Sequence, residues 1–138
     1  MRALTLTAAS VGLSLLLAAC SPASYQDGVY TGLSSKDEDG AWAKVTITLK
    51  NNEIVDAQYV TFQADGSIKD ENYGAGAAEL GNSGFYQKAQ HAVEAMKIYR
   101  DCLVRKKSID GVDRISGATI AYDQFTEAVN NALSQAEQ

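Results

Sequence analysis

The chain is organised around Asp113-Arg114-Ile115-Ser116-Gly117-Ala118-Thr119. This segment separates residues 109–112, which predict a turn and a short strand, from residues 120–136, which predict an amphipathic helix. Thr119 is therefore expected at the N-cap of that helix, directly after two small residues. The unpaired N–H groups and the positive dipole end of a helix N-terminus can bind a phosphate.

The same segment also has a purely structural interpretation. Ser and Thr before helices commonly serve as caps, each worth about 1 kcal/mol, and an adjacent Gly commonly serves as a turn residue. Short motifs also match by chance. On these residues alone, a phosphate site and a simple helix cap both stay open.

Asp113-x-x-Ser116-Gly117-Ala118-Thr119 resembles the flavinylation motif of the FMN-binding domain family. That family includes flavin subunits of sodium-pumping quinone reductases and Rnf-type complexes, and small membrane-anchored lipoproteins. Asp27-Gly28-Val29-Tyr30-Thr31-Gly32 is similar to the family's opening D-G-x-Y-x-G strand, and Ala128-Val129-x-x-Ala132-Leu133 is similar to its ending. The resemblance therefore covers most of the chain after residue 26.

The resemblance implies that Thr119 carries FMN through a phosphoester bond. Many members follow this Thr with another Thr or Ser pair, whereas this chain continues with Ile120-Ala121-Tyr122, so noncovalent FMN binding stays open. The family's attachment reaction uses FAD and a separate Mg-dependent flavin transferase, which is the implied partner. The other motif positions expected at the cofactor are Asp113, Ser116, Gly117 and Ala118.

The first 19 residues have the features of a secretory signal. Arg2 supplies a positive charge, and the apolar run that follows is too short to span a membrane. The run closes with Leu17-Ala18-Ala19-Cys20, which looks like a bacterial lipobox, with Cys20 as the lipidated residue. An ordinary signal peptide with an incidental Cys is the alternative. The expected organisation is a signal peptide at 1–19, a tether at 20–26 and an FMN-binding domain at 27–138.

The composition argues against nucleic-acid binding, a disulfide and a metal site. Without residues 1–19 the chain has 11 Lys and Arg against 17 Asp and Glu, a net charge of −6. An acidic chain does not favour nucleic-acid binding. If Cys20 is acylated, Cys102 has no disulfide partner, and it is predicted to be a small buried residue. His91 is the single His, so we expect a surface helix residue and no metal site.

Hydrophobic periodicity predicts the secondary structure. Asn51-Asn52 tolerates positive φ and suits a tight hairpin between two alternating, half-buried strands. The predicted fold class is α+β, a mainly antiparallel curved sheet packed on one face by two helices. The strands are expected at 29–32, 42–49 and 54–62, and the helices at 85–107 and 120–136.

A glycine-rich stretch at 64–84 interrupts the pattern and contains Tyr73. Long loops in small domains are commonly either functional or disordered. Glycines let the backbone approach a ligand closely, and an aromatic ring stacks favourably on a flat one. We therefore expect Tyr73 to lie near the isoalloxazine of FMN, with a simple connector as the alternative.

The predicted function is that of a membrane-anchored flavoprotein on the extracytoplasmic side, carrying electrons through FMN on Thr119. It would exchange electrons with a membrane donor or acceptor. The sequence offers no nucleophile–base pair, so no catalytic residue is predicted and a carrier is favoured over an enzyme. The alternatives are a noncovalent FMN- or heme-binding module and a surface-antigen lipoprotein without a redox role.

Overall fold

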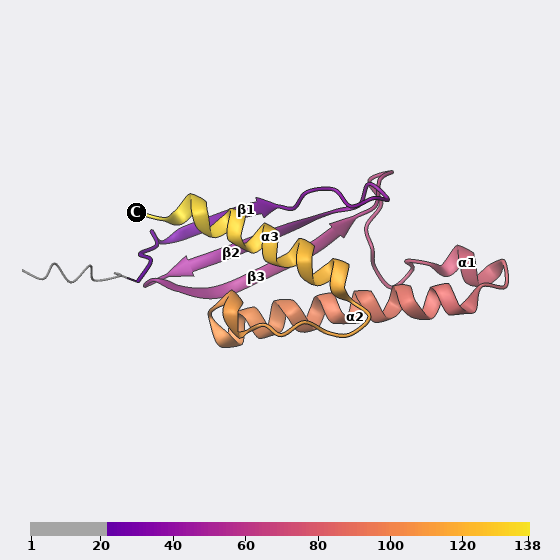
Figure 1. Ribbon diagram of the computed structural model, residues 1–138. Coiled ribbons are helices and arrows are strands. Elements are labelled where there is room, and N and C mark those ends of the chain that lie inside the picture. The colour runs from indigo at the N-terminus through magenta and orange to yellow at the C-terminus, as the bar shows by residue number, and fades with distance from the viewer. Residues whose placement is uncertain (1–21) are drawn as a thin grey trace, which may run out of the picture.

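The computed structural model describes residues 22–138 and consists of one three-stranded sheet covered by helices (Figure 1). The strands pair antiparallel in the order β1-β2-β3, which confirms the predicted α+β class. The predicted signal segment and Cys20 lie outside the described residues. In chain order, the elements are β1 (Gly28–Leu33), β2 (Trp42–Lys50), β3 (Glu53–Phe62), α1 (Ala75–Glu79), α2 (Ser83–Lys106), η1 (Ile109–Gly111) and α3 (Thr119–Ala136).

The central strand β2 shows why the sheet has one buried face. Val45, Ile47 and Leu49 point inward and are buried, whereas Lys44 and Thr46 lie on the other face and are half-exposed. This alternation follows from the two-residue period of a strand. The β2–β3 hairpin turns at residues 51 and 52, which adopt φ values of 52° and 64°, as predicted for this Asn pair.

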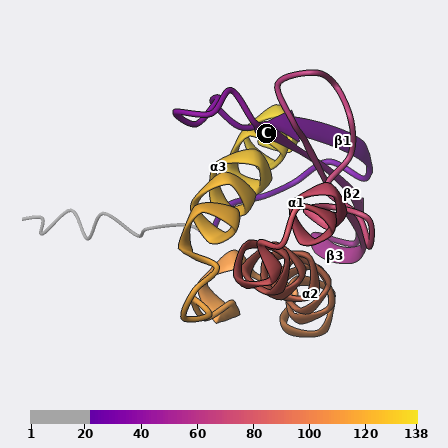
Figure 2. The same cartoon turned by 90° about the vertical axis from the view of Figure 1, so that its right-hand side faces the viewer.

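Both long helices cover the same face of the sheet. α3 packs across β1 and β2, and α2 packs along β3, so the two helices lie side by side on one face (Figures 1 and 2). Between them the rings of Tyr99 and Phe125 stack with centroids 5.8 Å apart, and Tyr59 packs 4.8 Å from Phe125. The core therefore lies between the sheet and the helix pair, as the sequence predicted.

Gly32 sets the closest approach between the sheet and α3. A Cβ at this position would lie 1.9 Å from the carbonyl oxygen of Ala128 and 2.5 Å from the nitrogen of Ala132. Only a residue without a side chain fits such a contact. Near the start of the same strand, a carboxylate oxygen of Asp27 accepts the N–H of Asn51 at 2.8 Å. The D-G-x-Y-x-G segment thus joins β1 to both α3 and the β2–β3 hairpin.

Three local predictions need correction. Ile109–Gly111 form the 3-10 helix η1, capped by Val112, instead of a turn and a strand, because Ser108 Oγ accepts the N–H of Asp110 at 3.2 Å and starts a helical turn. The 64–84 stretch contains the short helix α1. Cys102 is half-buried, with its Sγ 3.5 Å from the carbonyl oxygen of Gly111.

α2 begins two residues earlier than predicted. The side chain of Asn82 accepts the N–H of Phe85 at 3.1 Å, which caps the helix at Ser83. Its C-terminal cap is Lys107, in the left-handed conformation. In the part of the chain that the structure describes, none of the helices combines the length and the apolar character that crossing a membrane requires.

Candidate flavin site

The N-cap of α3 is Ala118, so the prediction that Thr119 is the N-cap was wrong. The N–H of Ala118 bonds to the carbonyl of Ile115 at 3.1 Å, and its own carbonyl accepts the N–H of Tyr122 at 3.0 Å. The helical hydrogen bonds therefore begin one residue earlier than expected. Thr119 is the first helical residue, and its exposed side chain caps nothing.

The first turn of α3 presents free donors. The backbone N–H groups of the first three helical residues have no intrahelical partner by geometry. Among the described residues, no acceptor bonds the N–H of Thr119, Ile120 or Ala121, and the turn contains no acidic side chain. Such an uncapped N-terminus suits an anion, because the donors and the helix dipole act together.

Side chains of α2 hold the loop before α3 in place. Tyr99 accepts the N–H of Ile115 at 2.9 Å and donates its hydroxyl to Ala118 O at 3.3 Å. His91 Nε2–H donates to the carbonyl of Ser116 at 2.7 Å. Gly117 has φ of 80°, and a Cβ there would lie 3.2 Å from the His91 ring. The conformation of this loop therefore depends on its contacts with Tyr99 and His91 of α2 as well as on its own sequence.

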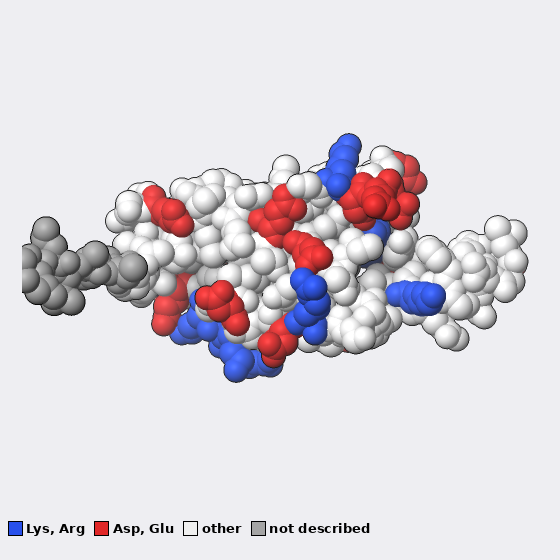
Figure 3. All heavy atoms as spheres, viewed as in Figure 1, with Lys and Arg blue, Asp and Glu red and all other residues white. Residues whose placement is uncertain are grey.

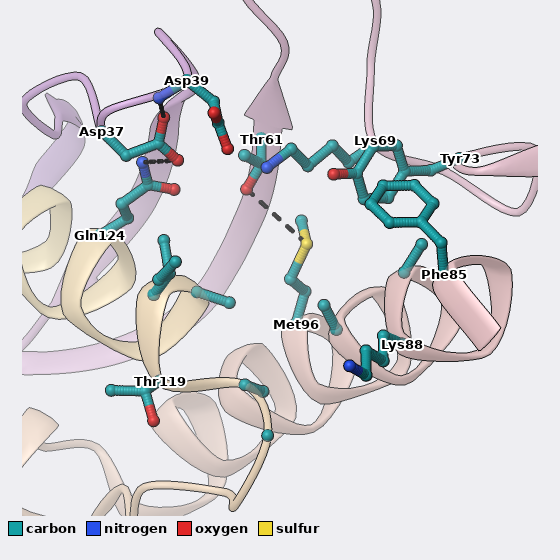
Figure 4. Close-up of a pocket in the computed structure, with 16 residues that line it drawn as sticks. Asp37, Asp39, Thr61, Lys69, Tyr73, Phe85, Lys88, Met96, Thr119 and Gln124 are labelled. Atoms are coloured by element: carbon teal, nitrogen blue, oxygen red, sulfur yellow. Dashed lines mark hydrogen bonds between the residues drawn. The ribbon is translucent and has the colours of Figure 1, made fainter. Parts of the chain in front are cut away.

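A cavity of about 420 Å³ opens between the N-terminal half of α2, the start of α3 and the loops at one end of the sheet (Figure 4). Its walls combine apolar and polar surface. The apolar and aromatic residues are Tyr73, Phe85, Ala89, Ala92, Met96, Ile120 and Ala121. The charged and polar residues are Asp37, Asp39, Lys69, Lys88, Thr61 and Gln124, together with Gly117, Ala118 and Thr119 from the motif.

The cavity brings together four of the six residues that the sequence singled out. Thr119, Gly117 and Ala118 line it at α3, and Tyr73 lines it from the glycine-rich stretch. Ser116 and Asp113 are exposed and do not line it. Ser116 contributes its carbonyl to His91 instead. Thr119 lies at one edge of the cavity, with its hydroxyl oxygen on the side away from Asp37 and Gln124 (Figure 4).

One end of the cavity is aromatic. Tyr73 and Phe85 meet edge to face with centroids 6.2 Å apart, and the Lys69 ammonium lies 5.1 Å from the Tyr73 ring centroid. Lys69 extends from there toward Thr61 (Figure 4). Partial burial, and then the nearby charges of Asp39 and Asp37, raise the pKa of Tyr73, so its phenol stays neutral at physiological pH.

The opposite end is polar and internally bonded. Gln124 is buried and donates to Ala41 O at 2.9 Å and to Asp37 Oδ2 at 3.4 Å. The other oxygen of Asp37 accepts the N–H groups of Asp39 and Ala41 at 3.0 and 2.8 Å. These bonds fix the β1–β2 loop against α3, so this wall of the cavity is rigid.

Sequence reasoning missed Lys69, Lys88 and Gln124. A lysine on a helix or in a polar loop is the commonest surface residue, so Lys69 and Lys88 gave no signal. Gln124 did offer one, because it directly precedes Phe125 in the apolar stripe of the last helix and is 6% exposed. A polar residue buried in an apolar stripe needs partners.

The model of the FMN-binding domain family matches residues 40–134. The chain belongs to the FMN-binding domain family. FMN is therefore its cofactor, and the protein is a flavin-binding protein. The matched residues run from the β1–β2 loop, next to Asp39, into the last turns of α3, so they contain nearly the whole cavity.

Two solved structures are similar to this FMN-binding domain. The crystal structure of the CPE2226 protein from Clostridium perfringens is 28% identical, with 81% of this chain and 88% of that chain covered and a TM-score of 0.61. A solution NMR structure from Clostridium thermocellum is 26% identical, with 82% and 93% covered and a TM-score of 0.48. The comparison with curated proteins gave no match.

The residues around the cavity are of the kinds that FMN requires. A volume of about 420 Å³ falls in the range of small-molecule sites. The aromatic and aliphatic walls suit a flat ring system, and the free N–H groups at the start of α3 suit a phosphate. Lys88 lines both this cavity and a second groove on the His91 side of Gly117, which places a cation near the same helix start.

Proposed function

We propose that this FMN-binding domain is a membrane-anchored, extracytoplasmic electron carrier whose FMN is attached covalently to Thr119. The single observation that supports attachment is the position of this residue. Its hydroxyl is exposed, makes no capping bond and stands on the first turn of α3 at the edge of the cavity. When bound, FMN supplies the redox chemistry, and the protein supplies binding and orientation.

The charge around Thr119 favours a phosphoester. The bonded phosphate keeps about one negative charge, which the free N–H groups and the dipole of α3 stabilise. Lys88 adds a positive charge on the wall of the same cavity. Asp113 is exposed and lies outside the cavity, so recognition by the attaching enzyme is the role that suits it.

Attachment requires a partner enzyme. A flavin transferase would use FAD, and the hydroxyl oxygen of Thr119 would replace AMP on the phosphorus of the FMN half. The bond to AMP breaks, the new Thr–O–P bond forms, and the hydroxyl proton is released. The exposed position of Thr119 at a helix start leaves this oxygen open to a second protein.

Noncovalent FMN binding is the second candidate. The observation that favours it is the sequence Ile120-Ala121-Tyr122 after Thr119, where many members of the family have another Thr or Ser pair. Both candidates use the same cavity and differ only in the bond. Acid precipitation separates them, because only covalently bound flavin stays with the precipitated protein.

The test is flavin fluorescence in a denaturing gel after co-expression with a flavin transferase. Thr119→Val should abolish the fluorescent band, and Ser116→Ala, a matched control in the loop before α3, should keep it. Because the Thr119 side chain caps nothing, Thr119→Val should change the free energy of unfolding by no more than a few tenths of a kcal/mol. An equally fluorescent Thr119→Val variant would refute attachment at this residue.

A further inference from the structure

The segment that leads into the domain is fastened to one end of it. The N–H of Tyr25 bonds to the side chain of Asn52 at 2.7 Å, in the β2–β3 hairpin. The N–H of Gln26 bonds to the carbonyl of Ala136 at 2.8 Å, and that of Gln138 bonds to the carbonyl of Ser24 at 3.0 Å. The segment from Ser24 therefore belongs to the folded body, next to the hairpin and the C-terminus.

This fastening shortens the free part of the tether. Asn52 Nδ2 also reaches the carbonyl oxygen of Ala23 at 3.4 Å. Only three peptide links separate Ala23 from Cys20. Three residues span at most ~11 Å when fully extended. A lipid on Cys20 would therefore hold the hairpin end of the domain, which we call the tether end, within about this distance of the lipid head groups.

The flavin cavity lies at the other end of the sheet. β2 runs from Trp42, which pairs with Phe62 beside the cavity residue Thr61, to Lys50 at the hairpin. Its nine residues span roughly 27 Å at the rise of an antiparallel strand. In Figure 1 the indigo start of the described chain and the C-terminus lie at the left, whereas the start of α3 and the N-terminal half of α2 lie to the right.

The two ends carry different runs of successive charges. Arg105 and Lys106 end α2 and Lys107 caps it. Lys107 pairs with Glu53 of the hairpin, which places this basic run at the tether end, where Asp27 and Asp110 also lie. Three successive acids, residues 37–39, lie in the β1–β2 loop at the cavity end, where acidic side chains gather in Figure 3. No ion pair among the described residues involves Arg105 or Lys106, so an anionic bilayer attracts these two side chains, whereas it repels the acidic run 37–39.

The geometry points to the tether end as the surface of the domain that contacts anionic lipid head groups. The flavin cavity, at the other end of the sheet, then lies away from the bilayer. This inference rests on the lipid anchor of the proposed function. It assigns the electron partner to the aqueous side, as a protein domain that reaches the cavity, and excludes direct exchange with a carrier dissolved among the lipid tails.

The test uses tryptophan fluorescence of the full lipidated chain in vesicles of phosphatidylcholine and phosphatidylglycerol that contain a lipid with a nitroxide head group. Trp42 is the single native Trp and reports on the cavity end of the sheet. Two further reporters, each combined with Trp42→Phe, are Ser24→Trp at the tether end and Leu80→Trp beside α1. Both replaced side chains are exposed, Leu80 by 90%.

We expect the nitroxide to quench the fluorescence of Ser24→Trp strongly. The fluorescence of Trp42 and of Leu80→Trp should be the same in vesicles with and without the nitroxide lipid. Quenching of Trp42 or Leu80→Trp equal to that of Ser24→Trp would overturn the orientation, since the domain would lie flat. Sedimentation with the vesicles reports the anchor separately. A chain that sediments without quenching of Ser24→Trp overturns only the orientation, whereas a chain that does not sediment also overturns the anchor.

A charge variant tests whether the cations at the end of α2 help to orient the domain on an anionic bilayer. Arg105→Gln combined with Lys106→Gln should increase the quenching of Trp42 on the anionic vesicles, because the domain is then held upright less firmly. Lys97→Gln is the matched control, since it removes a cation in the middle of α2 that already pairs with Glu94. Unchanged quenching of Trp42 in the double variant would contradict a contribution from these cations.

Discussion

Tyr73 and Phe85 form the aromatic end of the cavity in which we propose that FMN binds. Because a ring packed on the flavin alters its surroundings, Tyr73→Ala should shift the absorption maximum or the reduction potential of bound FMN. Tyr86→Ala is the control, since this residue lies on α2 outside the cavity lining. Spectra and potentials that are the same for Tyr73→Ala and the parent would remove Tyr73 from the site.

Single residues were predictable where a motif or an unusual type gave a signal. Gly117, Ala118 and Thr119 were found from the motif, and the cavity brings them together with Tyr73. The N-cap was misplaced because Ala118, a poor capping residue by type, takes that position when Tyr99 and the Ile115 carbonyl fix the loop. Such a cap is set by tertiary contacts, which local sequence does not contain.

The contact between β1 and α3 depends on a missing side chain at Gly32. Gly32→Ala would place a Cβ 1.9 Å from Ala128 O, so the helix must move away from the strand. We expect a loss of about 3 kcal/mol or more in the free energy of unfolding, as for other overpacked cores. Urea denaturation measures it.

Gly76→Ala is the matched control for that substitution. This glycine lies within α1, and nothing stands within 4 Å of an added Cβ. Its stability should stay the same or rise by up to ~1 kcal/mol, because alanine favours a helix. Equal losses in both variants would show that β1 and α3 are not held at the distance described.

A partly buried phenol links the sheet to α3. The hydroxyl of Tyr59 donates to Ala121 O at 2.7 Å, and burial raises the pKa of Tyr59 far above its ordinary value near 10. Above about pH 10 the unfolded chain loses this proton first, so the free energy of unfolding falls as the pH rises. Tyr59→Phe should cost about 1 kcal/mol at neutral pH and make the alkaline decline shallower.

Urea denaturation at several pH values between neutral and strongly alkaline gives this slope. Tyr99 is a second phenol whose pKa is raised by burial. The alkaline decline in the free energy of unfolding should therefore be smaller in Tyr59→Phe than in the parent, but still present. An unchanged alkaline slope in Tyr59→Phe would contradict the link between this phenol and stability.

At the scale of elements, the sequence predicted what periodicity controls. The alternation in β2 and the helical spacing in α3 both predicted their elements correctly, because one face of each is buried. η1 was missed because three residues hold no period, and a serine cap decides their conformation. α1 was missed for the same reason, inside a stretch that glycines mark as a loop.

For the whole molecule, the anchor is the prediction that decides location. Cys20→Ser removes the thiol that would be lipidated, so the protein should leave the membrane fraction or remain unprocessed. Cys102→Ser is the control, because Cys102 lies on α2, far along the chain from the lipobox. Cell fractionation with a size comparison decides it. A mature-size Cys20→Ser protein in the membrane fraction would contradict the lipoprotein assignment.

The central claim is that Thr119 carries FMN, and peptide mass spectrometry tests it most directly. Trypsin cuts after Arg114, and the rest of the chain contains no Lys or Arg, so residues 115–138 form one peptide. After co-expression with a flavin transferase, we expect this peptide to gain the mass of FMN less one water, with fragment ions that place the addition on Thr119. An unmodified peptide, or an addition on Ser116, would contradict the claim.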